Sequence, residues 1–253
     1  MLKFDIEKKH GLARVGVIHT PHGDIKTPAF VGAATRATVK ALTMDEVKTL
    51  GAQAILANTY HLILRPGADL INEAGGLAEF CSWHGPTFTD SGGFQIFSLP
   101  NVKINENGVK FKSHIDGANF EMTPESSMRD QWKIGADIHM AFDHLAKSES
   151  YEDMKTAMER THAWLDRCIA EHKRLSSVGG GAGGPPPRAD KRRGRWGKLR
   201  RQDPPRVNSI CLPSFRAATS MIYVLNRRDT VLQNPSTALV LAEFLLSTAW
   251  TKC

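Results

Sequence analysis

The chain has 253 residues, of which 41% are hydrophobic and 23% are charged, and its formal net charge is +7. This composition excludes a wholly disordered or collagen-like chain, and no apolar run reaches the roughly 18 residues that a membrane-spanning helix needs. The first residues lack the apolar stretch of a secretory signal, and the four cysteines form no C-x-x-C pair. We therefore expect a soluble, cytoplasmic protein without a membrane partner.

The positive charge is concentrated in the last third of the chain. Residues 1–178 contain 20 Lys and Arg against 22 Asp and Glu, and they hold all 10 histidines. Residues 179–253 contain 13 basic against 4 acidic residues, and there Arg outnumbers Lys. We therefore divide the chain into a first segment, 1–178, and a second segment, 179–253.

The first segment opens with signals for a hairpin and a helix. Residues 12–18, the turn-rich HTPHGD and a second short run predict a β-hairpin near the N-terminus. Thr43 and Glu46 stand three residues apart, as in a capping box, so we predict a helix that begins there and ends at Gly51.

One short apolar run and one short Thr-Phe-Thr run then predict strands. Residues 54–57 form the first and end at Asn58. Residues 87–89 form the second and lead into Asp90 and a diglycine turn. Each predicted strand therefore ends at a polar side chain.

An antiparallel insertion is expected next. The dipeptides at 107–108 (Asn-Gly) and 116–117 (Asp-Gly) are strong hairpin signals. They separate the alternating segments 102–104, 109–111 and 120–122. We predict a small sheet of hairpins here.

The remaining part of the first segment returns to helix and strand. Thr123 and Pro124 supply an N-cap and a first-position proline for a helix that ends at Gly135. Residues 138–142 predict a compact strand that ends at Asp143. A long helix should follow over residues 150–174. Its apolar face is predicted to consist of Met154, Met158, Leu165 and Ile169.

Helices that alternate with short buried strands predict an α/β fold with a mainly parallel sheet. In a barrel of this kind, functional residues gather at the carboxyl ends of the strands. Asn58, Asp90 and Asp143 all fall at such ends. This coincidence indicates a functional site.

The stretch TDSGGFQ at 89–95 has the residue types that a site for a flat ligand needs. The carboxylate of Asp90 is followed by a hydroxyl and two glycines, which let backbone approach a ligand closely. Phe94 offers a ring for stacking, and Asp143 a second carboxylate that could accept the N–H and NH₂ edge of a guanine-like base. The alternative is that both aspartates cap helices or fill turns, the commonest role of Asp at turns. Spacing alone leaves both interpretations open.

Residues 4–150 resemble the N-terminal half of the bacterial-type tRNA-guanine transglycosylases (queuine tRNA-ribosyltransferases). The matching stretches occur in the family's order: TPAF at 27–30, TVKALT at 38–43, GAQ at 51–53, NTYHL at 58–62, LRPG at 64–67, TDSGGFQ at 89–95 and MAFD at 140–143. The resemblance implies a (β/α)₈ barrel with a zinc-binding insertion. It also implies exchange of the wobble guanine of a tRNA anticodon for a 7-deazaguanine precursor of queuosine.

The resemblance implies roles for eight residues. Asp90 matches the family's catalytic aspartate, the proton acceptor, and Asp143 matches the aspartate that reads the guanine edge. The other matches lie in or near the base pocket: Ser91, Gly92, Gly93, Phe94, Asn58 and Gln95. The implied partners are the tRNA anticodon loop, guanine or a 7-deazaguanine, and a second copy of the chain.

Several family features have no counterpart in this sequence. They are the nucleophilic aspartate, the V-Q-G-G type motif that reads the base, and the C-x-C-x-x-C run with a distant His that binds zinc. His144 also stands where bacterial relatives usually carry Glu. We therefore expect an incomplete barrel with no metal ligands and impaired or absent activity. The alternatives are a non-catalytic tRNA-binding or partner subunit that keeps the base pocket, or an unrelated barrel enzyme acting on small molecules.

The second segment, 179–253, does not match the family. Residues 179–187 are a Gly/Pro-rich spacer, and residues 191–201 form a basic run that contains Trp196. The run has three interpretations: an RNA-binding arm, a disordered linker, or the product of a shifted reading frame without a selected function. We expect disorder here.

Overall fold

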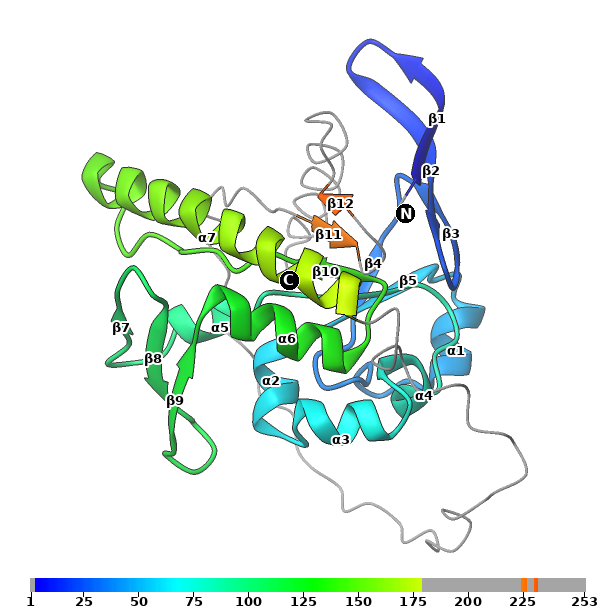
Figure 1. The fold of residues 1–253 in the computed structure, drawn as a ribbon. Coiled ribbons are helices and arrows are strands. Elements are labelled where there is room, and N and C mark those ends of the chain that lie inside the picture. Colours follow the sequence, from blue (N-terminus) through cyan, green and yellow to red (C-terminus); the bar gives the residue numbers. More distant parts are fainter. Residues whose placement is uncertain (1–2, 179–223, 227–229, 232–253) are drawn as a thin grey trace, which may run out of the picture.

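The computed structural model describes residues 3–178, 224–226 and 230–231. The described chain contains a sheet at the N-terminus, a central mainly parallel sheet, and a small inserted sheet (Figure 1). The first of these is antiparallel and is formed by β1 (Lys3–His10), β2 (Ala13–Thr20) and β3 (Gly23–Thr27). The predicted hairpin is therefore confirmed as β2 and β3, and β1 extends it.

The central sheet carries the parallel strands that the sequence predicted. Its order in the described residues is β12-β11-β10-β6-β5-β4, and the neighbours β4, β5, β6 and β10 are parallel. The bounds of its strands are β4 (Val31–Ala33), β5 (Ala54–Ala57), β6 (Thr87–Thr89), β10 (Ile138–Met140), β11 (Val224–Asn226) and β12 (Thr230–Val231). The mixed α/β fold with a parallel sheet is thus confirmed.

β10 is two residues shorter than the predicted strand 138–142. Its pairing with β6 ends at His139 and Thr89. Beyond that point the side chain of Gln131, in place of β6, binds the backbone of Met140, which still pairs with Val224 of β11 on its other side. The strand therefore stops before Asp143.

Short helices fill the connections between the parallel strands. α1 (Met44–Thr49) begins at the predicted capping box, in which Thr43 Oγ1 accepts from Glu46 N and the Glu46 carboxylate accepts from Thr43 N at 2.7 Å. Four further short helices were not predicted from the sequence: α2 (Thr59–Leu64), α3 (Ala68–Glu73), α4 (Leu77–Cys81) and α5 (Gly93–Phe97). None has a side-chain hydrogen bond at its N-cap, because the N-caps of α3, α4 and α5 are glycines and the N-cap of α2, Asn58, donates its amide to Asp90 instead.

The predicted insertion is confirmed as an antiparallel sheet. It comprises β7 (Lys103–Ile104), β8 (Val109–Lys112) and β9 (Asn119–Met122), in the order β7-β8-β9. The helix that follows it, α6 (Pro124–Ile134), starts at the Thr123 N-cap and ends at Gly135, whose φ of 82° places it in the left-handed region. Both ends of α6 agree with the prediction.

The long helix is α7 (Tyr151–Val178), which lies along α6 (Figure 1). Its predicted apolar face was correct for Leu165 and Ile169, which pack against the core, but wrong for Met154 and Met158, which are each 50% exposed. The buried face is formed by Ala157, Thr161, Trp164 and Cys168. Trp164 decides this orientation: its ring stacks on Phe142 at a centroid distance of 5.0 Å, and its Nε1 donates to the backbone oxygen of Glu106.

One core cluster joins the N-terminal sheet to the parallel strands. Ile18 and Ile25 pack in it with Val31, Ala54 and Ile138, the first residues of β4, β5 and β10, and with Phe88 and Met140. Ile25 and Phe88 are completely buried, and burial of such a side chain contributes roughly 1.5–3 kcal/mol. The opposite, carboxyl ends of the same strands are the ones that carry the candidate site.

None of the helices in the described residues is long and apolar enough to cross a membrane. Apart from β11 and β12, the second segment lies outside the described residues, and so does the prediction that it is disordered.

Candidate functional site

Asp90 follows β6 and lies in a network of donors from the end of β5. Thr59 N donates to Asp90 Oδ1 at 2.8 Å, and Thr59 Oγ1 donates to the backbone oxygen of Asp90 at 2.6 Å. Asn58 Nδ2 donates to Oδ2 of the same carboxylate, and Gly92 N donates to Oδ1 at 3.2 Å. The structure therefore brings Asn58 and Asp90 together, as expected from their places at neighbouring strand ends.

Burial raises the pKa of Asp90 to about 6, although hydrogen bonds from Asn58, Thr59, Gly92 and Gln95 act in the opposite direction. An ordinary aspartate has a pKa of about 3.9 and is ionised throughout the neutral range. A carboxyl group with a pKa of about 6 can take up and release a proton close to neutral pH. Asp90 is thus chemically suited to act as a proton acceptor.

Asp143 follows β10 and is joined to the loop after β6. Ser91 Oγ donates to Asp143 Oδ1 at 2.8 Å, and Gly93 N donates to Ser91 Oγ at 3.2 Å. Burial raises the pKa of Asp143, while the hydrogen bond from Ser91 lowers it. The second predicted carboxylate therefore lies beside the first loop.

The two glycines of this loop allow a close approach that other residues would not. Gly92 has a φ of 80°, and a Cβ on it would lie 3.2 Å from Tyr60 N. A Cβ on Gly93 would lie 3.0 Å from both the backbone oxygen and Oδ1 of Asp143. The diglycine thus lets the loop fit between α2 and Asp143.

Phe94 and Gln95 occupy the first turn of α5, directly after the diglycine. The Phe94 side chain is 39% exposed, so part of its ring is available at the surface. Gln95 Oε1 is buried and has no hydrogen-bond partner among the described residues. Such an acceptor can receive a donor from a ligand that enters the site.

Three side chains that hold the site residues and the strand ends in place were not identified from the sequence. Thr59 holds Asp90 by two hydrogen bonds, as described above. Ser127 Oγ donates to the backbone oxygen of Ser91 at 3.0 Å, and Gln131 is hydrogen-bonded to the ends of both β6 and β10. Ser127 and Gln131 could have been noticed in the sequence, because they are polar residues at buried positions of the α6 helical repeat, where apolar residues are expected.

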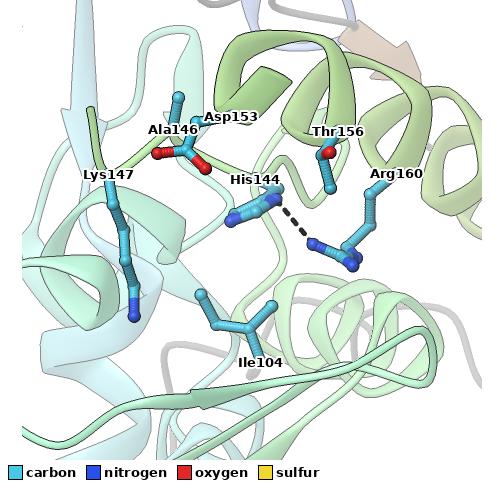
Figure 2. Close-up of a pocket in the computed structure, with 7 residues that line it drawn as sticks. All are labelled: Ile104, His144, Ala146, Lys147, Asp153, Thr156 and Arg160. Carbon is cyan, nitrogen blue, oxygen red and sulfur yellow. Dashed lines mark hydrogen bonds between the residues drawn. The ribbon is translucent and has the colours of Figure 1, made fainter. Parts of the chain in front are cut away.

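A cavity of about 180 Å³ lies between the β10–α7 connection, α7 and β7 (Figure 2). It is lined by Ile104, His144, Ala146, Lys147, Asp153, Thr156 and Arg160. Arg160 Nη1 lies 3.1 Å from His144 Nδ1, and Arg160 Nη2 donates to Glu106 Oε1 at 2.5 Å. Burial, together with Arg160 and Lys147, lowers the pKa of His144 to about 4, so the ring is neutral and its Nδ1 accepts. His144 thereby ties this connection to α7, and the lining includes none of the eight predicted site residues.

The geometry defines a class of protein. It is an α/β protein with a parallel sheet whose carboxyl edge holds two carboxylates linked through a serine, the edge at which such sheets bind their ligands. The chain belongs to the queuine tRNA-ribosyltransferase family, whose model matches residues 8–187. The predicted resemblance is thus confirmed.

Individual relatives agree with this assignment. The chain is 54% identical over 177 residues to a queuine tRNA-ribosyltransferase of Herpetosiphon aurantiacus, a match that covers 69% of the chain and 45% of the relative. The enzyme of Desulforamulus reducens is 50% identical over 175 residues, with coverages of 68% and 47%. That of a Synechococcus strain is 48% identical over 178 residues, with coverages of 69% and 48%. The chain therefore spans about half the length of the curated relatives it matches.

Proposed function

We propose that this chain carries the base-recognition half of a tRNA-guanine transglycosylase. The reaction is the exchange of the wobble guanine in a tRNA anticodon for a 7-deazaguanine, a precursor of queuosine. One observation supports this proposal above the others: Asp90 and Asp143 lie at adjacent strand ends and are joined through Ser91, which donates to Asp143 at 2.8 Å. The relatives that are about 50% identical to the chain are all named queuine tRNA-ribosyltransferases, which supports the same reaction.

The chemistry of the reaction fits these side chains. The wobble base must leave the anticodon stack before any enzyme can reach its glycosidic bond. Asp143 would then accept the N–H and NH₂ groups of the guanine edge, and the exposed face of Phe94 would stack on the ring. Asp90, with a pKa of about 6, would take the proton that the incoming base gives up.

The four parallel strands correspond, in this proposal, to the first half of a (β/α)₈ barrel. Their carboxyl ends form the face on which barrel enzymes place their active sites. The family's nucleophilic aspartate and V-Q-G-G type motif have no counterpart in the 253 residues. Because a carboxylate nucleophile would hold the ribose between the two half-reactions, we infer that this polypeptide alone is impaired in exchange. The proposed partners are a tRNA anticodon loop and a second copy of the chain, in the cytoplasm.

A zinc ion, which the family resemblance implies, does not fit the described residues. Among them, no three His, Cys, Asp or Glu side chains lie close enough together to hold a metal ion. The described cysteines, Cys81 and Cys168, are both free, and burial raises their pKa values to about 11 and about 12. Such thiols stay protonated, whereas zinc is bound by thiolates. No step of the proposal uses zinc.

Two measurements on the 253-residue chain test this function. Equilibrium dialysis with radiolabelled guanine measures base binding, and incorporation of the label into a cognate tRNA measures exchange. We expect guanine binding with little or no exchange, and we expect Asp143→Asn to abolish binding. Asp45→Asn, in the first turn of the exposed helix α1, is the matched control and should bind as the unaltered chain does.

Each other outcome changes the proposal in a defined way. Exchange at the rate of a full-length relative would contradict the inferred impairment. Absence of guanine binding by a folded chain would contradict the base-recognition role. Salt-dependent tRNA binding without either activity would instead favour the alternative, a non-catalytic tRNA-binding subunit.

A further inference from the structure

Gln131 is a completely buried amide whose hydrogen-bonding capacity is fully used. Its Oε1 accepts from Thr89 Oγ1 at 2.9 Å and from Met140 N at 2.9 Å. Its Nε2 donates to Met140 O at 2.8 Å and to Ser127 Oγ at 3.1 Å. Thr89 is the last residue of β6 and Met140 the last residue of β10, so a single side chain from α6 binds the ends of two neighbouring strands.

These bonds occur at the point where the two strands stop pairing with each other. β6 and β10 are joined at only two positions, Phe88 with Ile138 and Thr89 with His139. At the next residue, the backbone of Met140 binds the amide of Gln131 in both directions. The amide of Gln131 therefore takes the place of β6 at the position where β6 and β10 separate toward the site.

The residues that follow these two strand ends are the ones that carry the carboxylates. Asp90 comes immediately after Thr89, and Asp143 comes three residues after Met140. Ser127, one turn before Gln131 on α6, also reaches the site, because its Oγ donates to the backbone oxygen of Ser91. One face of α6 thus holds both carboxylate-bearing loops.

We propose that Gln131 is a positioning residue that sets the separation of the Asp90 and Asp143 loops and thereby the affinity of the site for a purine base. An apolar side chain of similar size fills the space but leaves the backbone of Met140 and the hydroxyl of Thr89 without their partners. The two strand ends can then shift relative to each other, and the Ser91–Asp143 hydrogen bond lengthens. A base that must contact both loops is then no longer held in the geometry that binding requires. The choice of a purine base as the ligand rests on the proposed function. The coupling of the two loops through Gln131 does not.

Gln131→Leu in the 253-residue chain tests this inference, with Met128→Leu as the control. Met128 is also completely buried on α6, but it belongs to the apolar cluster and not to the hydrogen-bonded network. Circular dichroism and thermal unfolding report the fold of each variant. Carbon-13 NMR of labelled aspartates gives the pKa of Asp143, and equilibrium dialysis gives the affinity for guanine.

We expect Gln131→Leu to bind guanine at least about tenfold more weakly. The pKa of Asp143 should rise, because the hydrogen bond from Ser91 that lowers it is weakened. Met128→Leu should change neither value, even if it lowers the thermal midpoint as much. Unchanged affinity and an unchanged Asp143 titration in folded Gln131→Leu would overturn the proposal.

Two further variants keep the proposal testable if Gln131→Leu does not fold. Thr89→Val removes one hydrogen bond to Gln131 with almost no change of shape, and Ser127→Ala removes another. Both should move the Asp143 titration in the same direction by a smaller amount, and a null result in both would also overturn the proposal. If the unaltered chain binds no guanine, the base-recognition function fails, while the Asp143 titration still decides the role of Gln131.

Discussion

Ser91 Oγ donates to Asp143 Oδ1 at 2.8 Å and itself accepts from Gly93 N at 3.2 Å. This pair of hydrogen bonds joins the loop after β6 to the loop after β10 through one hydroxyl group. The Ser91 side chain is buried, so water does not compete for the bond. The two carboxylate-bearing loops are therefore coupled directly, in addition to their common support on α6.

Ser91→Ala should raise the pKa of Asp143, because the hydroxyl that stabilises the ionised carboxylate is removed. We also expect weaker guanine binding, by about tenfold, the cost of one hydrogen bond to a charged group. Carbon-13 NMR titration and equilibrium dialysis measure the two effects. Ser177→Ala, which removes an exposed hydroxyl on α7, serves as the control, and equal behaviour of the two variants would contradict the prediction.

Gly93→Ala should disturb the approach of the loop after β6 to Asp143. A Cβ at this position would lie 3.0 Å from two oxygen atoms of Asp143, which is tighter than most real contacts. The loop and Asp143 must then move apart by a few tenths of an ångström, and guanine binding should be weakened. Gly32→Ala is the matched control, because its nearest neighbour would be Phe30 Cε1 at 4.0 Å. Retention of full affinity by Gly93→Ala would show that the close approach is not needed.

The pKa of Asp90 predicts how its contribution to stability depends on pH. The folded chain holds the Asp90 proton more tightly than the unfolded chain, since the folded pKa is about 6 and an ordinary aspartate has a pKa of about 3.9. Stability relative to Asp90→Asn should therefore rise as the pH falls from about 7 to about 4, by on the order of 1–3 kcal/mol. Urea unfolding of both proteins across this range measures the difference. A difference that stays constant with pH would mean that the pKa of Asp90 is not raised.

His144 predicts the opposite dependence. Its pKa of about 4 in the folded chain lies below the ordinary histidine value of about 6.5, so the unfolded chain binds this proton more tightly. Stability due to this group should be complete above pH 6.5 and should fall between pH 6.5 and 4, by on the order of 1–3 kcal/mol. We expect His144→Gln to remove this part of the acid sensitivity. His84→Asn, at an exposed histidine, should not, and urea midpoints at pH 7 and pH 5 decide between them.

Elements with a local chemical signal were predictable from the sequence. The capping residues Thr43 and Thr123 marked α1 and α6, and the dipeptides at 107–108 and 116–117 marked the inserted sheet. Helices α2 to α5 lack such caps and are five or six residues long, so tertiary packing rather than local sequence determines them. The buried face of α7 also depended on tertiary packing, because the contact of Trp164 with Phe142 is made across elements.

The placement of three candidate residues at one edge of the sheet was predictable, whereas the hydrogen bonds that connect the site were not. Asn58, Asp90 and Asp143 were expected at one edge because each follows a parallel strand, and the structure brings Asn58 onto Asp90. The hydrogen bond from Ser91 to Asp143 joins residues 52 positions apart, and no spacing in the sequence predicts it. Gln131 was identifiable only as a polar residue in an apolar repeat, and its partners became known from the fold.

The packing of Ile18 and Ile25 gives the central sheet two unlike ends. The N-terminal sheet packs in one cluster with the starting residues of β4, β5 and β10, and His22 Nδ1 lies 2.6 Å from Asp137 Oδ1, just before β10 begins. Asn58, Asp90 and Asp143 all follow the opposite ends of the parallel strands. Substitutions on the exposed surface of the N-terminal sheet are therefore expected to change stability without changing the residues of the candidate site.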